Sequence, residues 1–366
     1  MQDITATRRA LLVSGLATFV LLGVAQAIIG PALPVYQQMF GLTTGGAGWL
    51  VSGFWIGCFL GVIGIYLGAG RIGPRPGLAG SAAGALIMGL SPWWPAVILG
   101  GVVFGAGYGS LSAVFNPRIL SAYGARGPSM MGLLNAIFSL GAIAAPLVFL
   151  ALGGSPRDTL LVTALFAALI WLGSGGVSRG GAGANQAQTG FRLHWPILAF
   201  GVLAIGVEAS LVSLGPTALI RAGLEETQAA RLFSLFYVAY LLARTSLIFV
   251  ASRIPAFTIF SGAVAVTLAC ALGAIFISPV WFFPPLGISA SLFFQGFFVT
   301  GIRKMGTDAR VPSVIIASGL LGAIVLPLIC ARLMDGLGDR GFFWLILAAS
   351  VAMLAAAVPM HRQMVR

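Results

Sequence analysis

Twelve apolar segments, joined by short polar connections, constrain this chain more than any other feature of its sequence. An α-helix needs about 20 predominantly apolar residues to cross the hydrocarbon core of a bilayer. Only 8% of the 366 residues are charged, whereas soluble domains carry about 25%. We therefore predict an all-α polytopic membrane protein of twelve transmembrane helices. The predicted spans are residues 10–38, 46–68, 77–91, 95–116, 128–151, 158–174, 194–220, 228–250, 256–277, 280–302, 311–333 and 341–360.

One connection is unlike the others. The segment from Ser174 to Arg192 is rich in glycine and polar, and it lacks apolar periodicity, which is typical of a flexible linker. We predict an N-terminal six-helix half at 1–174, a cytoplasmic linker at 175–193 and a C-terminal six-helix half at 194–366.

Short repeats relate the two predicted halves. The sequence LGAI at 140–143, followed two residues later by Pro-Leu, recurs at 321–324 with an offset of 181 residues. Gly-Pro pairs in the first and seventh spans and Ser-Pro pairs before the fourth and tenth spans recur at offsets of 185 and 187. Three matches in the same order predict two structurally similar halves.

The basic residues predict the orientation. With the N-terminus inside, fourteen of the 20 Lys and Arg residues fall on the cytoplasmic side and five on the other, while Arg244 lies within a span. The positive-inside rule then places both termini in the cytoplasm. We expect the protein to lie in the inner or plasma membrane. Because the basic residues form no stripe on a soluble face, we expect a lipid bilayer and not nucleic acid as partner, despite a net charge of +12.

Glu208 is the only acidic residue near the middle of a span. A carboxylate at bilayer depth costs several kcal/mol unless it is protonated, paired or facing water, and such groups usually mark transport pathways. We interpret Glu208 as a candidate for proton coupling or substrate binding; a structural ion pair or hydrogen-bond network is the alternative.

Arg244 in the eighth span has two interpretations. It could pair with Glu208 or bind an anionic substrate, or it could reach the cytoplasmic headgroups. Tyr237, Tyr240 and Arg244 share one helix face by their spacing, which favours a site facing a cavity.

Uncharged polar and aromatic side chains in other spans are further candidates for substrate contact. For each of them helix–helix hydrogen bonding, packing or lipid contact is the alternative, and Pro117 after Asn116 is expected to end the fourth span. The candidates are Gln26, Trp55, Tyr108, Asn116, Asn135 and Gln295.

Prolines within the spans predict helix breaks. Proline removes a backbone donor and bends a helix, and interrupted helices at matching positions of two halves point to a transport site. We expect a break at Leu214-Gly215-Pro216 and bends that serve gating. The prolines concerned are Pro31, Pro34, Pro146, Pro216 and Pro327.

Enzymatic chemistry finds no support in the sequence. Both histidines lie at predicted span ends, the three cysteines fall singly in apolar segments, and no phosphate-binding loop or nucleophile motif is found. We expect no enzyme activity, no cofactor and no metal site.

The loop after the second span carries a family resemblance. Gly70-Arg71-Ile72-Gly73-Pro74-Arg75 resembles the signature loop of the major facilitator superfamily, with Arg71, Gly73 and Arg75 matching and Gly70 replacing the acidic residue. Twelve spans, a central linker and repetition of six helices fit the same superfamily. The resemblance implies a central cavity lined by spans 1, 4, 5, 7, 8 and 10.

Two further segments are similar to the fucose/glucose–H⁺ symporter group of that superfamily. These are the stretch from Asn135 to Pro146 in the fifth span and Gly206-Val207-Glu208-Ala209-Ser210 in the seventh. The carboxylates that fucose carriers use in the first and fourth helices have no counterpart here; Gln26 and Asn116 are the polar residues of those spans.

The sequence therefore predicts a monomeric secondary transporter that moves a small organic solute by alternating access. Proton-coupled symport of a sugar-like or other small polar solute is the preferred hypothesis, with protons as the coupling ion. Proton-driven efflux of amphipathic compounds, uniport, and a transporter-like scaffold or sensor are the alternatives.

Overall fold

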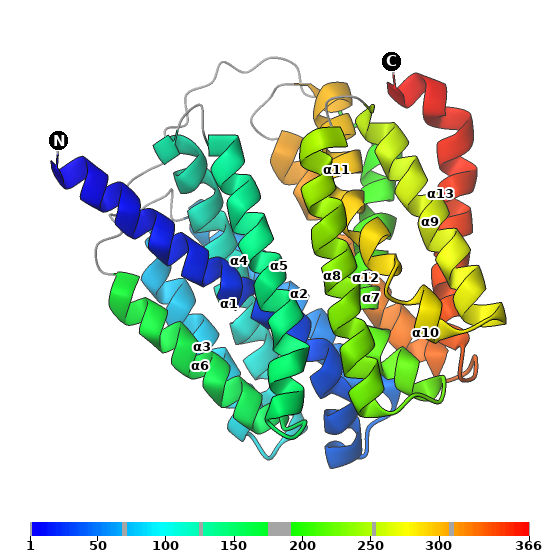
Figure 1. Ribbon diagram of the computed structural model, residues 1–366, viewed down its shortest axis with the longest axis horizontal. Coiled ribbons are helices and arrows are strands. Elements are labelled where there is room, and N and C mark those ends of the chain that lie inside the picture. The colour runs from blue at the N-terminus through cyan, green and yellow to red at the C-terminus, as the bar shows by residue number, and fades with distance from the viewer. Residues whose placement is uncertain are drawn as a thin grey trace. The chain divides into compact units, whose positions relative to one another are not determined.

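The computed structural model describes residues 2–67, 72–123, 127–174, 192–250, 254–306 and 311–365 (Figure 1). All regular secondary structure in these ranges is helical. The helices are α1 (Gln2–Phe40), α2 (Thr44–Leu67), α3 (Pro74–Leu90), α4 (Trp94–Tyr123), α5 (Gly127–Ala151), α6 (Pro156–Gly173), α7 (Trp195–Arg221), α8 (Glu226–Val250), α9 (Ala256–Phe276), α10 (Pro279–Phe282), α11 (Leu286–Met305), α12 (Val311–Met334) and α13 (Gly341–Val365).

Ten of the spans formed by these helices are long and apolar enough to cross a membrane. The ten include the joined segment Pro279–Met305, while α3 and α8 supply the third and eighth spans. Twelve spans result, which confirms the predicted all-α fold and identifies a multi-pass membrane protein.

The tenth span is split, which the sequence analysis did not predict. The four-residue α10 and the longer α11 are separated by Phe283-Pro284-Pro285, since the consecutive prolines lack the N–H groups that a continuous helix would need. Phe283 is fully buried and packs against α7, where a Cβ on Gly215 would lie 2.5 Å from its ring.

The chain divides into two compact units. The first comprises residues 1–40 and 49–184, and the second comprises residues 41–48 and 185–366. The segment 41–48, which the sequence analysis counted in the N-terminal half, lies with the second unit. Residues 175–191 of the predicted linker lie outside the described residues.

Within the first unit, glycines allow helix backbones to touch. A Cβ on Gly23 of α1 would overlap the Phe138 carbonyl oxygen of α5, and a Cβ on Gly141 of α5 would overlap the Val20 carbonyl oxygen of α1. The same holds for Gly57 of α2, whose Cβ would overlap a carbonyl oxygen of α4. In a bilayer, where lipid tails are as apolar as leucine, such close approach supplies much of the attraction between helices.

The second unit repeats this packing. A Cβ on Gly322 of α12 would overlap the Val202 carbonyl oxygen of α7. Gly322 is the counterpart of Gly141 at the offset of 181 residues, and both pack on the first long helix of their own unit. The contacts of α3 with α6 in the first unit likewise correspond to those of α9 with α13 in the second.

The predicted helix breaks at proline are not observed as interruptions. Pro31 and Pro34 lie inside α1, and Pro216 lies inside α7, which continues to Arg221. The expected break at Leu214-Gly215-Pro216 is therefore wrong: flanking turns and neighbouring helices keep the segment helical despite the missing donor. Pro146 in α5 and Pro327 in α12 are also interior, and all five prolines are buried.

The candidate membrane span formed by α4 ends at Asn116, as predicted, but the expectation that Pro117 ends the helix is wrong. The helix α4 continues through this residue to Tyr123. Proline lacks only its own N–H, so the carbonyl four residues earlier loses one hydrogen bond while the helix resumes beyond it.

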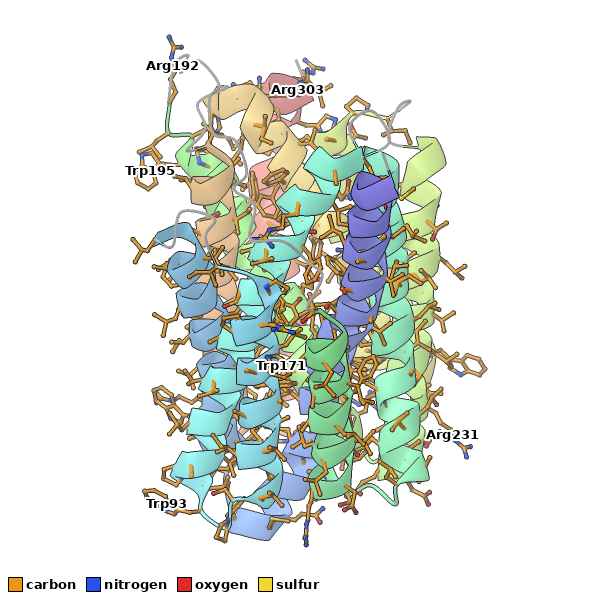
Figure 2. All side chains as sticks on the ribbon, turned by 90° about the vertical axis from the view of Figure 1, so that its left-hand side faces the viewer. Trp93, Trp171, Arg192, Trp195, Arg231 and Arg303 are labelled. Atoms are coloured by element: carbon orange, nitrogen blue, oxygen red, sulfur yellow. The ribbon has the colours of Figure 1, made fainter. Side chains whose placement is uncertain are left out.

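Exposed side chains mark the two ends of the second unit. Arg192, Trp195 and Arg303 project at one end and Arg231 at the other (Figure 2). Trp195 is 70% exposed at the start of α7, a position typical of the interfacial aromatic belt of a membrane protein.

Candidate functional site

Three candidate residues of α8 lie near Glu208 in the second unit. This residue is the middle residue of α7, thirteen positions from each end of the helix. No other acidic residue of the described helices lies more than a turn from a helix end. Glu208 is half-buried, and the hydroxyl of Tyr240 on α8 donates a hydrogen bond of 2.9 Å to its Oε1 atom.

Tyr240 also contacts Arg244. The guanidinium carbon of Arg244 lies 4.8 Å from the centroid of the Tyr240 ring, a cation–π contact. The charge of Arg244 also interacts electrostatically with the Glu208 carboxylate. Tyr240 therefore contacts both charged groups, through its hydroxyl on one side and its ring face on the other.

Tyr237 completes this group. It is fully buried, and its ring lies 5.8 Å from that of Tyr240 and packs edge-on to Phe233 and Phe236. The predicted common face of Tyr237, Tyr240 and Arg244 on α8 is thus present in the structure. We call this group the acidic cluster, after its one carboxylate; its members are Glu208, Tyr237, Tyr240 and Arg244.

A second group of candidates meets in the first unit. Tyr108 of α4 donates a hydrogen bond of 2.9 Å to Gln26 Oε1 of α1. Trp55 of α2 lies edge-on to Tyr108, with ring centroids 6.2 Å apart. These three residues, from three different helices, form the amide–aromatic cluster.

Trp55 has an unusual environment within the amide–aromatic cluster. Its side chain is only 8% exposed, yet its indole Nε1–H has no hydrogen-bond partner in the described part of the chain. A buried donor left unpaired costs about 1–3 kcal/mol, and so it points to a group that binds there.

The remaining polar candidates are not brought into either cluster. Asn116 is half-buried and donates to Ser112 Oγ one turn earlier on α4, at 3.2 Å. Asn135 is half-buried on α5, and its carbonyl oxygen accepts a hydrogen bond from Ser139. Gln295 is exposed on α11.

The loop that carries the family resemblance is partly described. Arg71 lies outside the described residues, and Gly73 is the N-cap of α3. Arg75 in the first turn of α3 stacks on Trp171 of α6, 5.1 Å from the ring centroid. Arg118 donates a hydrogen bond of 3.0 Å to the Ile72 carbonyl oxygen and so ties this loop to α4.

Sequence reasoning missed one polar group, an ion pair between Arg221 and Asp335 at 3.1 Å. The available signal was two opposite charges at the ends of two helices, Arg221 in the last turn of α7 and Asp335 directly after α12. The separation of 114 residues hid the pairing.

The chain is similar over nearly its whole length to several solved structures. No family model and no curated protein matches it. Solved structures do match: FucP, described as a Major Facilitator Superfamily transporter in the outward conformation, has a TM-score of 0.65 and 19% identity over 95% of this chain and 97% of that one. This chain has the major facilitator fold.

Two other structures of this fold agree over similar lengths. A mutant of the nucleoside transporter NupG has a TM-score of 0.75 and 15% identity, covering 97% of this chain and 99% of its own. A D-xylose–proton symporter has a TM-score of 0.74 and 13% identity, covering 96% of each chain. The fold expected from the signature loop, the linker and the repeats is thereby confirmed.

Proposed function

We propose that this protein is a secondary transporter that moves a small neutral organic solute by proton-coupled symport, with Glu208 as the proton-carrying group. The observation that supports this most is the position of Glu208, at the middle of an apolar 27-residue helix and in hydrogen-bond contact with Tyr240. The neighbours of the same fold include a fucose–proton and a D-xylose–proton symporter.

The acidic cluster gives Glu208 two states of different stability. When ionised, the carboxylate accepts the Tyr240 hydrogen bond and is favoured by the Arg244 charge. When protonated, it no longer carries a charge that is costly at bilayer depth, and Arg244 loses its electrostatic partner. Uptake and release of a proton thus change what Tyr240 and Arg244 contact, which is the local change that a coupled transporter needs.

The amide–aromatic cluster is proposed to contact the solute. Gln26, Tyr108 and Trp55 carry no formal charge, and the Gln26 amide and the Trp55 indole both contain N–H donors. Aromatic edges beside such donors suit a neutral solute with hydrogen-bond acceptors on an apolar ring or chain. Sugars and nucleosides, the solutes named for neighbours of this fold, have these properties.

The experiment is uptake into liposomes that contain the purified protein. Sugars and nucleosides are tested with and without an inward proton gradient, for the wild type, Glu208→Gln and the control Glu225→Gln, which changes an exposed carboxylate between α7 and α8. We expect the gradient to drive accumulation in the wild type and in Glu225→Gln. In Glu208→Gln accumulation should fall to the level without a gradient, while exchange of solute across the membrane persists.

Accumulation by Glu208→Gln equal to that of the wild type would contradict the proposed coupling. Equal uptake at all gradients in the wild type would instead indicate uniport. Transport only of amphipathic cations or dyes would support efflux. This second hypothesis is favoured by the rings of Phe233 and Phe236, which pack on Tyr237 of the acidic cluster.

We also propose that both termini lie in the cytoplasm of a cell whose plasma or inner membrane holds the protein, and that it works as a monomer. The basic residues at the ends of the second unit support the orientation: Arg192 and Arg303 project at the proposed cytoplasmic end (Figure 2).

A further inference from the structure

The segment 41–48 connects α1 to the body of α2, yet it belongs to the second unit. The chain leaves the first unit after Phe40 and returns to it at Trp49, so these eight residues are held by helices far away in the sequence. We call this segment the strap. It lies where α7 and α12 end, which in the proposed orientation is the extracellular end.

Arg221 is the first of two residues that hold the strap in place. It lies in the last turn of α7, where the helix dipole favours a cation. Its guanidinium donates to Thr44 Oγ1 at 3.0 Å, to Asp335 Oδ1 at 3.1 Å and to the Met334 carbonyl oxygen at 2.7 Å. One side chain therefore joins the end of α7, the end of α12 and the strap.

Asp335 is the second residue that holds the strap in place. Its Oδ2 atom accepts a hydrogen bond of 3.0 Å from the Gly45 backbone N–H, while Oδ1 accepts from Arg221. Partial burial by itself would raise the pKa of Asp335, but hydrogen bonds from Gly45 and Thr44 and the charge of Arg221 lower it below its ordinary value. The carboxylate is consequently ionised, and the pair intact, at neutral pH.

The strap also fits closely against α12. A Cβ on Gly48 would lie 2.7 Å from the Ala331 side chain, and a Cβ on Gly45 would lie 3.1 Å from Cγ of Arg332. Glycine at these two positions lets the first turn of α2 lie directly on the last turns of α12.

The attachment is polar and partly open to solvent, with the side chains of Arg221 and Asp335 24% and 36% exposed. Water can replace each of its hydrogen bonds, so it can be released at modest cost. A dry apolar contact would not have this property. The hydrogen bonds of Arg221 and Asp335 therefore hold the strap in a specific position and can still be broken and formed again, as a gate requires.

We propose that Arg221 and Asp335 form a releasable fastener for the strap, and that its release controls opening of the transporter at this end. The gating part rests on the transport function proposed above. The fastening part does not, because it concerns only how the 41–48 backbone is held.

The first test is amide hydrogen exchange of the full-length protein in lipid nanodiscs. Asp335→Asn keeps the shape of the side chain and removes its charge, and Asp339→Asn removes an exposed acid of the same loop as a matched control. We expect exchange in the strap to be about tenfold faster in Asp335→Asn, the factor that loss of one hydrogen bond to a charged group gives. Thr44→Val, which removes one of the three Arg221 contacts, should give a smaller increase and serves if Asp335→Asn does not fold.

Unchanged strap exchange in Asp335→Asn, or an equal increase in Asp339→Asn, would overturn the fastener. The second test is the liposome uptake rate, which should change several-fold in Asp335→Asn and not in Asp339→Asn. A faster-exchanging strap with an unchanged uptake rate would overturn the gating role. If the wild type transports none of the solutes, the proposed function fails while the exchange result still decides whether the fastener exists.

Discussion

At the scale of single residues, Tyr240 connects the two charged groups of the acidic cluster, Glu208 and Arg244. Its hydroxyl contacts Glu208 and its ring contacts Arg244, so the two functions of one side chain can be separated by substitution. The helix spacing on α8 predicted that Tyr240 and Arg244 share a face. It could not predict that the hydroxyl reaches Glu208, because that contact depends on how α7 and α8 are rotated against each other.

Replacing Tyr240 tests this connection. Tyr240→Phe removes the hydrogen bond and keeps the ring, so proton-driven uptake should fall about tenfold and its pH dependence should shift, since the ionised carboxylate loses a donor. Tyr240→Leu removes the ring as well and should lower uptake further. Uptake and pH dependence in Tyr240→Phe that match the wild type would show that the hydroxyl has no part in coupling.

At the scale of helices, the apolar segments predicted the elements well and their interruptions poorly. Span positions follow from hydropathy, which depends on the local sequence. Whether Pro216 ends α7 or lies within it depends on neighbouring helices that compensate the missing hydrogen bond. The split of the tenth span at Phe283 has its own signal in two consecutive prolines, Pro284 and Pro285.

Replacing glycine by alanine should lower the stability of the protein only where that glycine contacts a neighbouring helix. Gly141→Ala places a methyl group on the Val20 carbonyl oxygen, so α1 and α5 must separate, at a cost of about 1–3 kcal/mol. Gly64→Ala on α2 is the matched control, because a Cβ there meets nothing within 4 Å. We expect thermal unfolding in detergent to shift down by a few degrees for Gly141→Ala only; similar melting temperatures for both variants would contradict the packing account.

At the scale of the whole molecule, orientation is the prediction with the simplest test. The three native cysteines, Cys58, Cys270 and Cys330, are buried, so background labelling by a membrane-impermeant thiol reagent should be low. In intact cells we expect Asp339→Cys to react from outside and Gln188→Cys, in the predicted linker, to react only after the cells are opened. The reverse pattern would place the termini outside.

The glycine-mediated helix contact that occurs in both units also bears on how the sequence evolved. Gly141 and Gly322 occupy equivalent positions at which even a methyl group overlaps a backbone oxygen. If the two halves descend from one duplicated ancestor, many positions have diverged, but glycine is present at both of these, where a side chain would force two helices apart. The LGAI sequence remains recognisable in both halves around a glycine whose Cβ would overlap a backbone oxygen of the neighbouring helix.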